Sequence, residues 1–203
     1  MILLHELKTY LDNKRIALIG NATSILDGDY GGIIDLHDIV IRMNHAIVGI
    51  EKDIYFRSIG KRTDIYIPNM NQEGVCYNMS IRSKAKYIAL FTRWHNDPNK
   101  RETGLLSKLD NLYLGDKSEF DKLRKEFDIY KPSTGATIFN FLIKNIKFKE
   151  LNIYGFDFFK SATKDVQNRN VFKSFLYKDH SAELEKKFFE KYINKIDNIK
   201  NYS

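Results

Sequence analysis

The sequence predicts an α/β fold in which a mostly parallel sheet carries helices on both faces. Short apolar runs rich in β-branched residues recur along the chain, and segments of helical period lie between them. Strands that are covered on both faces are apolar throughout instead of alternating, as these runs are. An alternation of strand and helix favours parallel strands joined by helices. The predicted strands are residues 15–19, 39–42, 63–67, 86–91, 111–114 and 151–154.

Helices are predicted between and around these strands. Residues 1–15 have the pattern of a short amphipathic helix, because His5 and Glu6 interrupt the apolar run that a signal peptide needs. Internal helices are predicted at 103–109, 118–127 and 134–146. From Ser181 onward an amphipathic helix is predicted, because apolar residues recur every three or four positions: Leu184, Phe188, Tyr192, Ile196 and Ile199. Its apolar face either packs on the sheet or binds a membrane or a partner subunit.

The composition indicates one domain, residues 1–203, that is soluble or peripheral to a membrane. Hydrophobic residues make up 43% of the chain, enough for a sizeable core, and no apolar window approaches the roughly 20 residues that span a bilayer. The formal net charge of +7 is spread among interleaved acidic residues, which favours an anionic substrate or lipid surface over nucleic acid. The single cysteine, Cys76, excludes an internal disulfide and a cysteine zinc finger, so we expect a reducing, cytoplasmic location.

Two turns that follow predicted strands are candidates for ligand binding, because ligands of parallel sheets bind at the carboxyl ends of the strands. Gly20 and Asn21 follow the first strand, and Asn44 follows the second. Gly20 can let the backbone approach a ligand, and each asparagine offers a donor and an acceptor. Ordinary turn and capping roles are the alternatives. The glycine spacing of a dinucleotide fingerprint and of a phosphate loop is missing, so we expect no such cofactor.

A third candidate is the start of the predicted helix at 134–146, where Ser133, Thr134 and Gly135 follow Pro132. Free backbone N–H groups and the positive end of the helix dipole favour a phosphate or carboxylate there. An ordinary serine or threonine cap is the alternative.

Two further patterns carry titratable groups. Asp27 and Asp29 have the spacing of paired metal-binding carboxylates, but they lie in a loop rich in glycine, so we expect an exposed turn and no metal. His180 lies just before the last predicted helix, five residues ahead of Glu185. Its alternatives are a surface histidine and a catalytic base.

These windows together resemble the animal-type sialyltransferases, a family of glycosyltransferases (family 29-like). Residues 16–49 (IALIGNATSILDGDYGGIIDLHDIVIRMNHAIVG), followed by IGKRTD, are similar to the large motif of that family. Residues 131–145 (KPSTGATIFNFLIKN), followed by LNIYGFD, are similar to its small motif, and His180 with Glu185 to its very small motif. The motifs stand in the family's order and cover about half of the chain.

The resemblance implies a Rossmann-like fold and an inverting, metal-independent transfer of sialic acid from CMP-sialic acid to a glycan hydroxyl. It implies donor contacts by Gly20 and by Asn21 and Asn44, on the nucleotide phosphate and ribose. It further implies that Ser133, Thr134 and Gly135 hold the donor carboxylate and cytidine. His180 would be the general base, while Tyr154, Gly155, Phe156 and Glu185 would be structural residues near the site. No cofactor beyond the CMP-sugar is implied.

The chain departs from the family at two points. The cysteines that join the large and small motifs are missing, since Ile16 stands near the first position, which fits a cytoplasmic bacterial member that builds a surface glycan such as lipopolysaccharide or capsule. The histidine that assists the leaving phosphate is also missing, and its place offers Tyr177 and Lys178. His37 is the competing candidate for the base.

Three alternatives remain. Transfer of Kdo or another nonulosonate from its CMP donor would present the same donor carboxylate and phosphate to these residues. The missing histidine leaves a catalytically silent nucleotide-binding domain open. The positive charge leaves contact with the inner membrane, as a peripheral protein, open. The acceptor glycan, the linkage and the oligomeric state are not encoded in these motifs.

Overall fold

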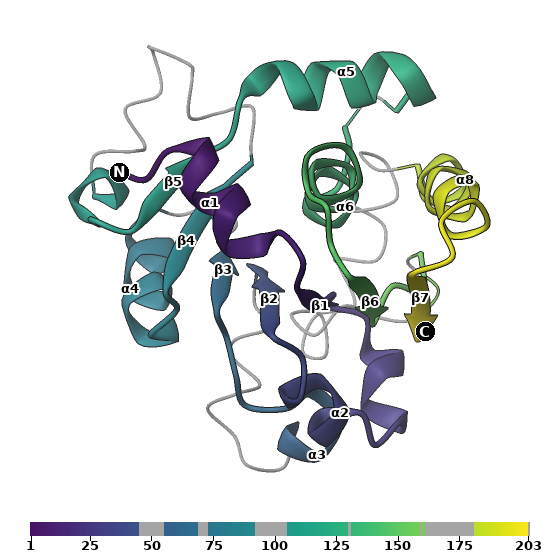
Figure 1. The fold of residues 1–203 in the computed structure, drawn as a ribbon, viewed down its shortest axis with the longest axis horizontal. Helices are drawn as coiled ribbons and strands as arrows, with labels where there is room; N and C mark the ends of the chain where they lie inside the picture. The colour runs from purple at the N-terminus through teal and green to yellow at the C-terminus, as the bar shows by residue number, and fades with distance from the viewer. Residues whose placement is uncertain are drawn as a thin grey trace.

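The computed structural model describes residues 1–44, 55–68, 73–91, 105–129, 131–158, 160 and 181–202. Within these residues, seven parallel strands form one sheet in the order β5-β4-β3-β2-β1-β6-β7 (Figure 1). The strands are β1 (Arg15–Ile19), β2 (Ile39–Met43), β3 (Ile65–Ile67), β4 (Tyr87–Leu90), β5 (Leu112–Leu114), β6 (Glu150–Tyr154) and β7 (Ile199–Tyr202). The predicted fold class is therefore confirmed, together with the six predicted strands: the bounds of β1 agree with the prediction, and those of the other five differ by one or two residues at one or both ends.

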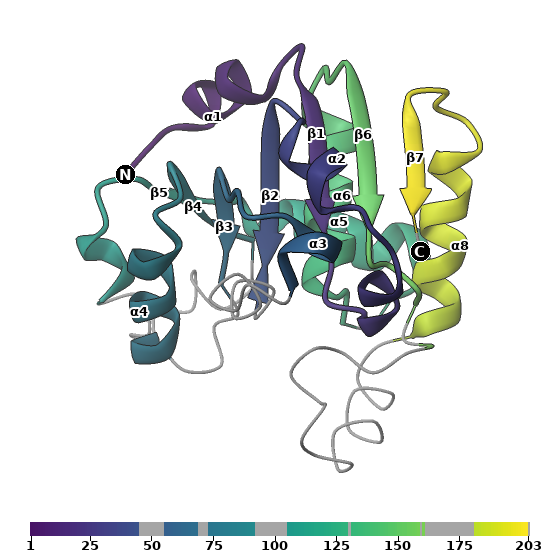
Figure 2. The same ribbon diagram turned by 90° about the horizontal axis from the view of Figure 1, so that it is seen from below.

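Helices cover both faces of the sheet, as Figure 1 shows. One face carries α5 (Lys117–Phe127), α6 (Thr134–Asn145) and α8 (Ala182–Ile193). The other carries α2 (Gly31–Asp35), α3 (Phe56–Ile59), α4 (Glu73–Ser83) and the 3-10 turn η1 (Thr23–Asp27). Helix α1 (Leu4–Leu11) crosses the edge at which the strands begin, and the 3-10 turn η4 (Leu106–Lys108) precedes β5 (Figure 2).

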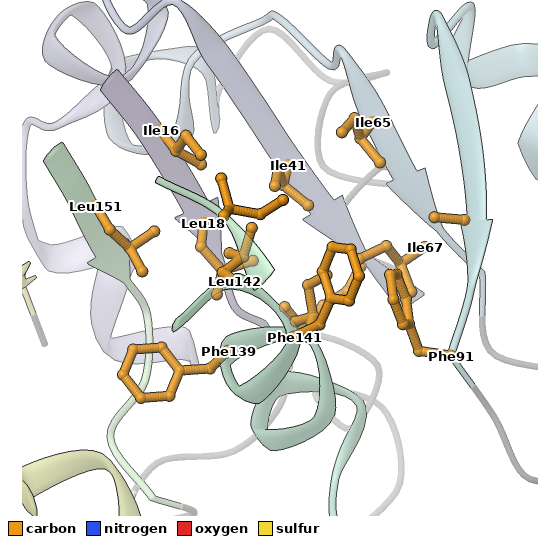
Figure 3. Close-up of a cluster of buried hydrophobic side chains, with 14 of the residues drawn as sticks. Ile16, Leu18, Ile41, Ile65, Ile67, Phe91, Phe139, Phe141, Leu142 and Leu151 are labelled. Atoms are coloured by element: carbon orange, nitrogen blue, oxygen red, sulfur yellow. The ribbon is translucent and has the colours of Figure 1, made fainter. Parts of the chain in front are cut away.

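Successive residues of each strand serve opposite faces of the sheet. In β1, Ile16 and Leu18 join the core under α6, whereas Ala17 and Ile19 face η1 and α2. Figure 3 shows Ile16 and Leu18 of β1 in the same cluster as Phe139, Phe141 and Leu142 of α6. All four of these β1 residues are buried, which explains why the strand is apolar throughout.

The order of the strands reverses at β1, which places a ligand crevice by topology. Chain order runs from β1 outward through β2 to β5 and then returns to the other side of β1 with β6. Ile19 is paired with Arg42 of β2 and with Tyr154 of β6, so the turns that follow these three strands are neighbours. In open parallel sheets, the crevice at such a reversal is where ligands bind.

The prediction for the carboxyl end of the last helix is wrong. Helix α8 stops at Ile193, and Ile199 lies in the edge strand β7, paired in parallel with β6. Apolar spacing alone did not separate a helix from a helix followed by a short strand, because Ile196 and Ile199 continue the helical period by coincidence. The apolar face of α8 is buried through Phe188 and Phe189, so it packs within the protein.

Two other helices also differ from the prediction. The helix predicted at 103–109 is, in its described part, the single 3-10 turn η4, and α4 was not predicted. No helix among the described residues has the length and apolar character that a membrane span requires.

Candidate functional site

The turn that follows β1 is packed tightly against the turn that follows β6. The Gly20 N–H donates to the Tyr154 carbonyl (2.7 Å), and the Ala22 N–H donates to the Gly155 carbonyl (3.2 Å). A Cβ atom on Gly20 would lie 2.3 Å from the Gly155 carbonyl oxygen, so any side chain is excluded there. Gly155 has φ +69°, a conformation that favours glycine. Both glycines thus serve the close approach of two backbones, which fixes the position of Asn21.

Asn21 and Asn44 follow two neighbouring strands at the carboxyl edge of the sheet. Each stands two residues beyond the paired residues Ile19 and Arg42 of β1 and β2. The Oδ1 atoms of both asparagines are buried without a hydrogen-bond partner among the described residues. A buried acceptor without a donor is costly, so two in one place are typical of a site that a ligand completes.

Asn44 is further constrained by its backbone. Its φ is +51°, in the left-handed region that asparagine tolerates better than most residues. Its carbonyl accepts a hydrogen bond from the Tyr66 hydroxyl (2.7 Å), which links the turn to β3. The backbone of Asn44 is thereby held at the end of β2.

The amino end of α6 is closed by Ser133, whose polar groups are all used within the protein. Its hydroxyl oxygen accepts from the Ala136 N–H (3.1 Å) as an N-cap, and its carbonyl accepts from the Thr137 hydroxyl (2.9 Å). Its own N–H and hydroxyl donate to the two carboxyl oxygens of Glu185, at 2.7 and 2.6 Å. The hydroxyl of Ser133 is thus committed to Glu185, and the first-turn N–H groups of Thr134 and Gly135 remain without a partner among the described residues.

Glu185 is a buried acid in the first turn of α8. Only 3% of its surface is exposed, and burial raises its pKa to about 7, against the opposing effect of the two hydrogen bonds from Ser133. The contact joins the segment that is similar to the small motif, at Ser133, to the segment that is similar to the very small motif, at Glu185. Sequence spacing offered no signal for it, because the two residues are 52 positions apart.

Phe156 is the shared neighbour of two candidate turns. A Cβ on Gly135 would lie 2.6 Å from the Phe156 ring, and a Cβ on Gly20 would lie 3.1 Å from it. The ring therefore fills the space between the turn that follows β1 and the amino end of α6. Gly135, like Gly20, packs closely against its surroundings, whereas the sequence had indicated a ligand-binding role for both.

Tyr154 lies on the other face of the sheet. Its ring is fully buried and stacks on Tyr202 of β7, with centroids 4.7 Å apart and planes inclined by 10°. Burial raises its pKa. This arrangement makes Tyr154 a core residue beneath the site.

His37 is unsuited to the role of competing base. It lies at the edge where the strands begin, opposite the asparagine pair, and is only 6% exposed. Its Nδ1 lies 2.9 Å from the Ile33 carbonyl oxygen, which can only accept, so Nδ1 carries the proton. Its Nε2 then accepts from Nδ2 of Asn152 (2.9 Å). Both ring nitrogens are engaged in holding α2 against β6.

The remaining charged residues of the large-motif segment form a structural network, which sequence reasoning missed. Arg42 is fully buried and donates to the carbonyls of Ile59 (2.6 Å) and Arg62 (2.8 Å). Burial lowers its pKa to about 10. The carboxylate of Asp35 accepts from the backbone N–H groups of Lys61 and Arg62. These contacts fix the segment that leads into β3, so these charged residues of the large-motif segment stabilise the fold.

Asp27 and Asp29 are both exposed at the end of η1 and just beyond it. The Asp29 carboxylate lies 3.0 Å from Nε of Arg57, an exposed ion pair. His180, Tyr177 and Lys178 lie outside the described residues. His180 directly precedes Ser181, whose hydroxyl caps α8 by accepting from the Leu184 N–H (3.4 Å).

A parallel sheet whose polar turns meet beside a reversal of strand order defines a Rossmann-like α/β protein. Two crystal structures with this fold are those of a mammalian sialyltransferase, one of them in complex with Gal-β-1,3-GalNAc-ortho-nitrophenol. The complex has a TM-score of 0.61 and 16% identity, and the second structure has a TM-score of 0.63 and 15% identity. Both matches cover 94% of this chain and 69% of the other.

The sequence points in the same direction. Residues 5–96 match the model of glycosyltransferase family 29 (sialyltransferase). A segment of 70 residues is 39% identical to CMP-N-acetylneuraminate-β-galactosamide-α-2,3-sialyltransferase 1 of Mus musculus, and one of 55 residues is 36% identical to a β-1,6-galactosyltransferase of Arabidopsis thaliana. These segments make up 32% and 27% of this chain, and only 19% and 13% of the two relatives.

Proposed function

We propose that the protein is an inverting, metal-independent glycosyltransferase that moves a sialic acid from CMP-sialic acid to a glycan hydroxyl. The observation that carries the proposal is the asparagine pair. Asn21 and Asn44 present two buried Oδ1 atoms without a partner among the described residues, at the reversal of strand order, where ribose hydroxyls of a nucleotide can donate to them. The match of residues 5–96 to the model of glycosyltransferase family 29 supports a sugar nucleotide as that ligand.

The first turn of α6 suits the negative charge of such a donor. The N–H groups of Thr134 and Gly135 lie at the positive end of a helix of 12 residues. Phe156 brings this turn close to the one that holds Asn21. A CMP-linked keto acid carries one phosphodiester and one carboxylate, so fixed dipoles of this kind can hold it without a metal.

The reaction we propose is a single displacement. The oxygen of the acceptor hydroxyl forms a bond to the anomeric carbon while the bond from that carbon to the phosphate oxygen breaks, and CMP leaves with the electron pair. His180 accepts the proton of the acceptor hydroxyl, because an imidazole with an ordinary pKa near 6.5 is matched to that task. Tyr177 and Lys178 are the groups we assign to the leaving phosphate.

The Arabidopsis relative makes a second donor class worth testing, because its name describes a galactosyltransferase. A galactose donor has no carboxylate, so it would leave the first turn of α6 without an anion from the sugar. Kdo and other nonulosonates share the carboxylate of sialic acid and would suit the same groups. We place these keto acids ahead of galactose for that reason.

The test is a donor panel. The protein is incubated separately with CMP-N-acetylneuraminate, CMP-Kdo and UDP-galactose, with and without EDTA, and release of the nucleotide is measured. We expect release of CMP from one of the two acidic donors, unaffected by EDTA. Asn21→Ala and Asn44→Ala should each slow it, while the exposed Asn194→Ala, at the far end of α8, should not.

Three results would overturn the proposal or part of it. Release from UDP-galactose alone would assign the protein to the second donor class. Loss of activity in EDTA, restored by manganese, would assign it to metal-dependent transfer. Binding of CMP without turnover of any donor would indicate a silent nucleotide-binding domain.

A further inference from the structure

Helix α1 lies across the edge of the sheet at which the strands begin, opposite the asparagine pair (Figure 2). Its inner face is buried through Leu7 and Leu11, each 1% exposed. Large apolar side chains at its amino end contact solvent: Met1 (74% exposed) and Leu3 (60%) precede the helix, and Leu4 (43%) is its first residue. Apolar side chains that gather on one surface are typical of a binding face.

The apolar residues are held in place rather than left on a loose end. The Ile2 N–H donates to the Leu112 carbonyl of the edge strand β5 (2.9 Å). At the other end of α1, the Asn13 N–H donates to the Lys147 carbonyl (2.8 Å), just before β6. The helix is therefore anchored at both ends, and the exposure of Leu3 and Leu4 is a property of the folded protein.

Lysines surround α1 on the same edge. Lys14, Lys147 and Lys149 meet at its carboxyl end, where the Lys149 N–H donates to the Lys14 carbonyl (2.9 Å). Three further exposed lysines stand just before β4 and β5: Lys84, Lys86 and Lys108. The Lys86 ammonium lies 4.1 Å from the centre of the Tyr10 ring, which places it against α1. None of these six has a carboxylate within ion-pair distance among the described residues.

The acidic residues of this edge are largely engaged in the fold. Glu6 accepts from the Leu3 N–H (2.6 Å), and Asp12 accepts from the Lys147 N–H (2.8 Å). Asp38 accepts from the Arg15 N–H (2.8 Å), and this hydrogen bond lowers its pKa. Asp110 and Asp197 are exposed acids of this edge for which the described residues offer no such bond. A carboxylate keeps its charge when it accepts a hydrogen bond, but the six lysines and Arg15 outnumber these five acids, so the edge carries a net positive charge.

We propose that the α1 edge, defined by Met1, Leu3, Leu4 and the six lysines, docks on an anionic lipid bilayer. A short apolar group flanked by lysines with long stems matches the boundary between acyl chains and anionic headgroups. The edge is opposite to the asparagine pair, so a docked protein keeps its donor crevice open to solvent. This inference concerns where the protein works and is independent of which sugar it transfers.

The test is co-sedimentation of the whole protein with vesicles of phosphatidylcholine, with and without phosphatidylglycerol. We expect binding only to the anionic vesicles, weakened by salt. Lys147→Glu with Lys149→Glu should weaken binding by about tenfold or more, since each basic residue near such a surface contributes about 1 kcal/mol. Leu3→Ser with Leu4→Ser should weaken it at low and high salt alike, because apolar insertion is not screened.

Matched double variants distinguish this edge from a general effect of charge or exposed apolar surface. Ile33→Ser with Leu36→Ser changes exposed apolar residues of α2 and its end (53% and 72% exposed), and Lys125→Glu with Lys160→Glu changes exposed lysines elsewhere. Both should bind vesicles like the wild type. Equal losses in the matched variants, or no binding of the wild type, would overturn the proposal. So would a shift of Leu3→Ser with Leu4→Ser from dimer to monomer without a change in vesicle binding, since it would assign the face to a second copy.

Discussion

The carboxyl group of Glu185 receives two hydrogen bonds from one residue, Ser133, through its N–H (2.7 Å) and its hydroxyl (2.6 Å). This contact attaches the first turn of α8 to the amino end of α6. The residue that directly precedes α8 is Ser181, and His180 stands before it in the chain. The pair thus ties the end of the segment that carries the proposed base to the helix that is proposed to hold the donor.

Stability should fall with rising pH through Glu185. Its pKa is about 7 in the folded protein, whereas the ordinary value of a glutamate is 4.5, so between these values the folded state binds more protons than the unfolded state. The contribution is fully present below about pH 4.5 and is lost as the pH rises through 7. Glu185→Gln should remove this part of the dependence, which amounts to about 3 kcal/mol at most. Urea unfolding of both proteins between pH 5 and about 8 measures it. Parallel curves would contradict the raised pKa.

The pair should also show thermodynamic coupling. Ser133→Ala removes an N-cap and both side-chain contacts of the hydroxyl, so we expect a loss of about 1–3 kcal/mol in the free energy of unfolding. In the Glu185→Gln background the same change should cost less, because the amide offers one acceptor oxygen in place of the two that receive the Ser133 N–H and hydroxyl. A double-mutant cycle gives the coupling free energy directly. A cycle with additive losses would show that the contact contributes nothing.

The packing of the candidate turns predicts a contrast between two glycines. Gly20→Ala places its Cβ 2.3 Å from the Gly155 carbonyl oxygen, and because backbone cannot yield easily, we expect a destabilised protein that binds CMP weakly. Gly32→Ala meets nothing within 4 Å and lies in α2, so it should be neutral or stabilising by about 1 kcal/mol or less. Thermal unfolding with and without CMP measures both. Equal effects at the two positions would refute the close approach.

Substitution of His180 should lower the rate of transfer, whereas substitution of His37 should lower stability. His180→Ala should lower the rate of transfer by about a hundredfold or more and leave CMP affinity within a few-fold, as expected for a positioned base. His37→Ala should lower stability instead, because it removes the hydrogen bonds to the Ile33 carbonyl and to Asn152. Steady-state kinetics and unfolding curves of both variants separate the two effects. Normal transfer by His180→Ala would show that another group is the base.

The sequence alone determined the class of fold and the places where chemistry could occur. Strand β1 was predicted at its observed bounds, because a strand covered on both faces must be apolar at every position, and such runs are visible one residue at a time. The candidate turns were also visible, since Asn21 and Asn44 follow their strands directly. The resemblance to a family, which rests on the order of the motifs, then narrowed the expected ligand to a CMP-sugar.

Only the tertiary structure decided how these residues act together. It showed that Asn21 and Asn44 follow paired strands, that Ser133 is bound to Glu185, and that Gly20 and Gly135 pack against Gly155 and Phe156. It also ended α8 at Ile193 and began β7 at Ile199. Each of these facts depends on contacts between residues far apart in the chain, and local periodicity and spacing carry no information about such contacts.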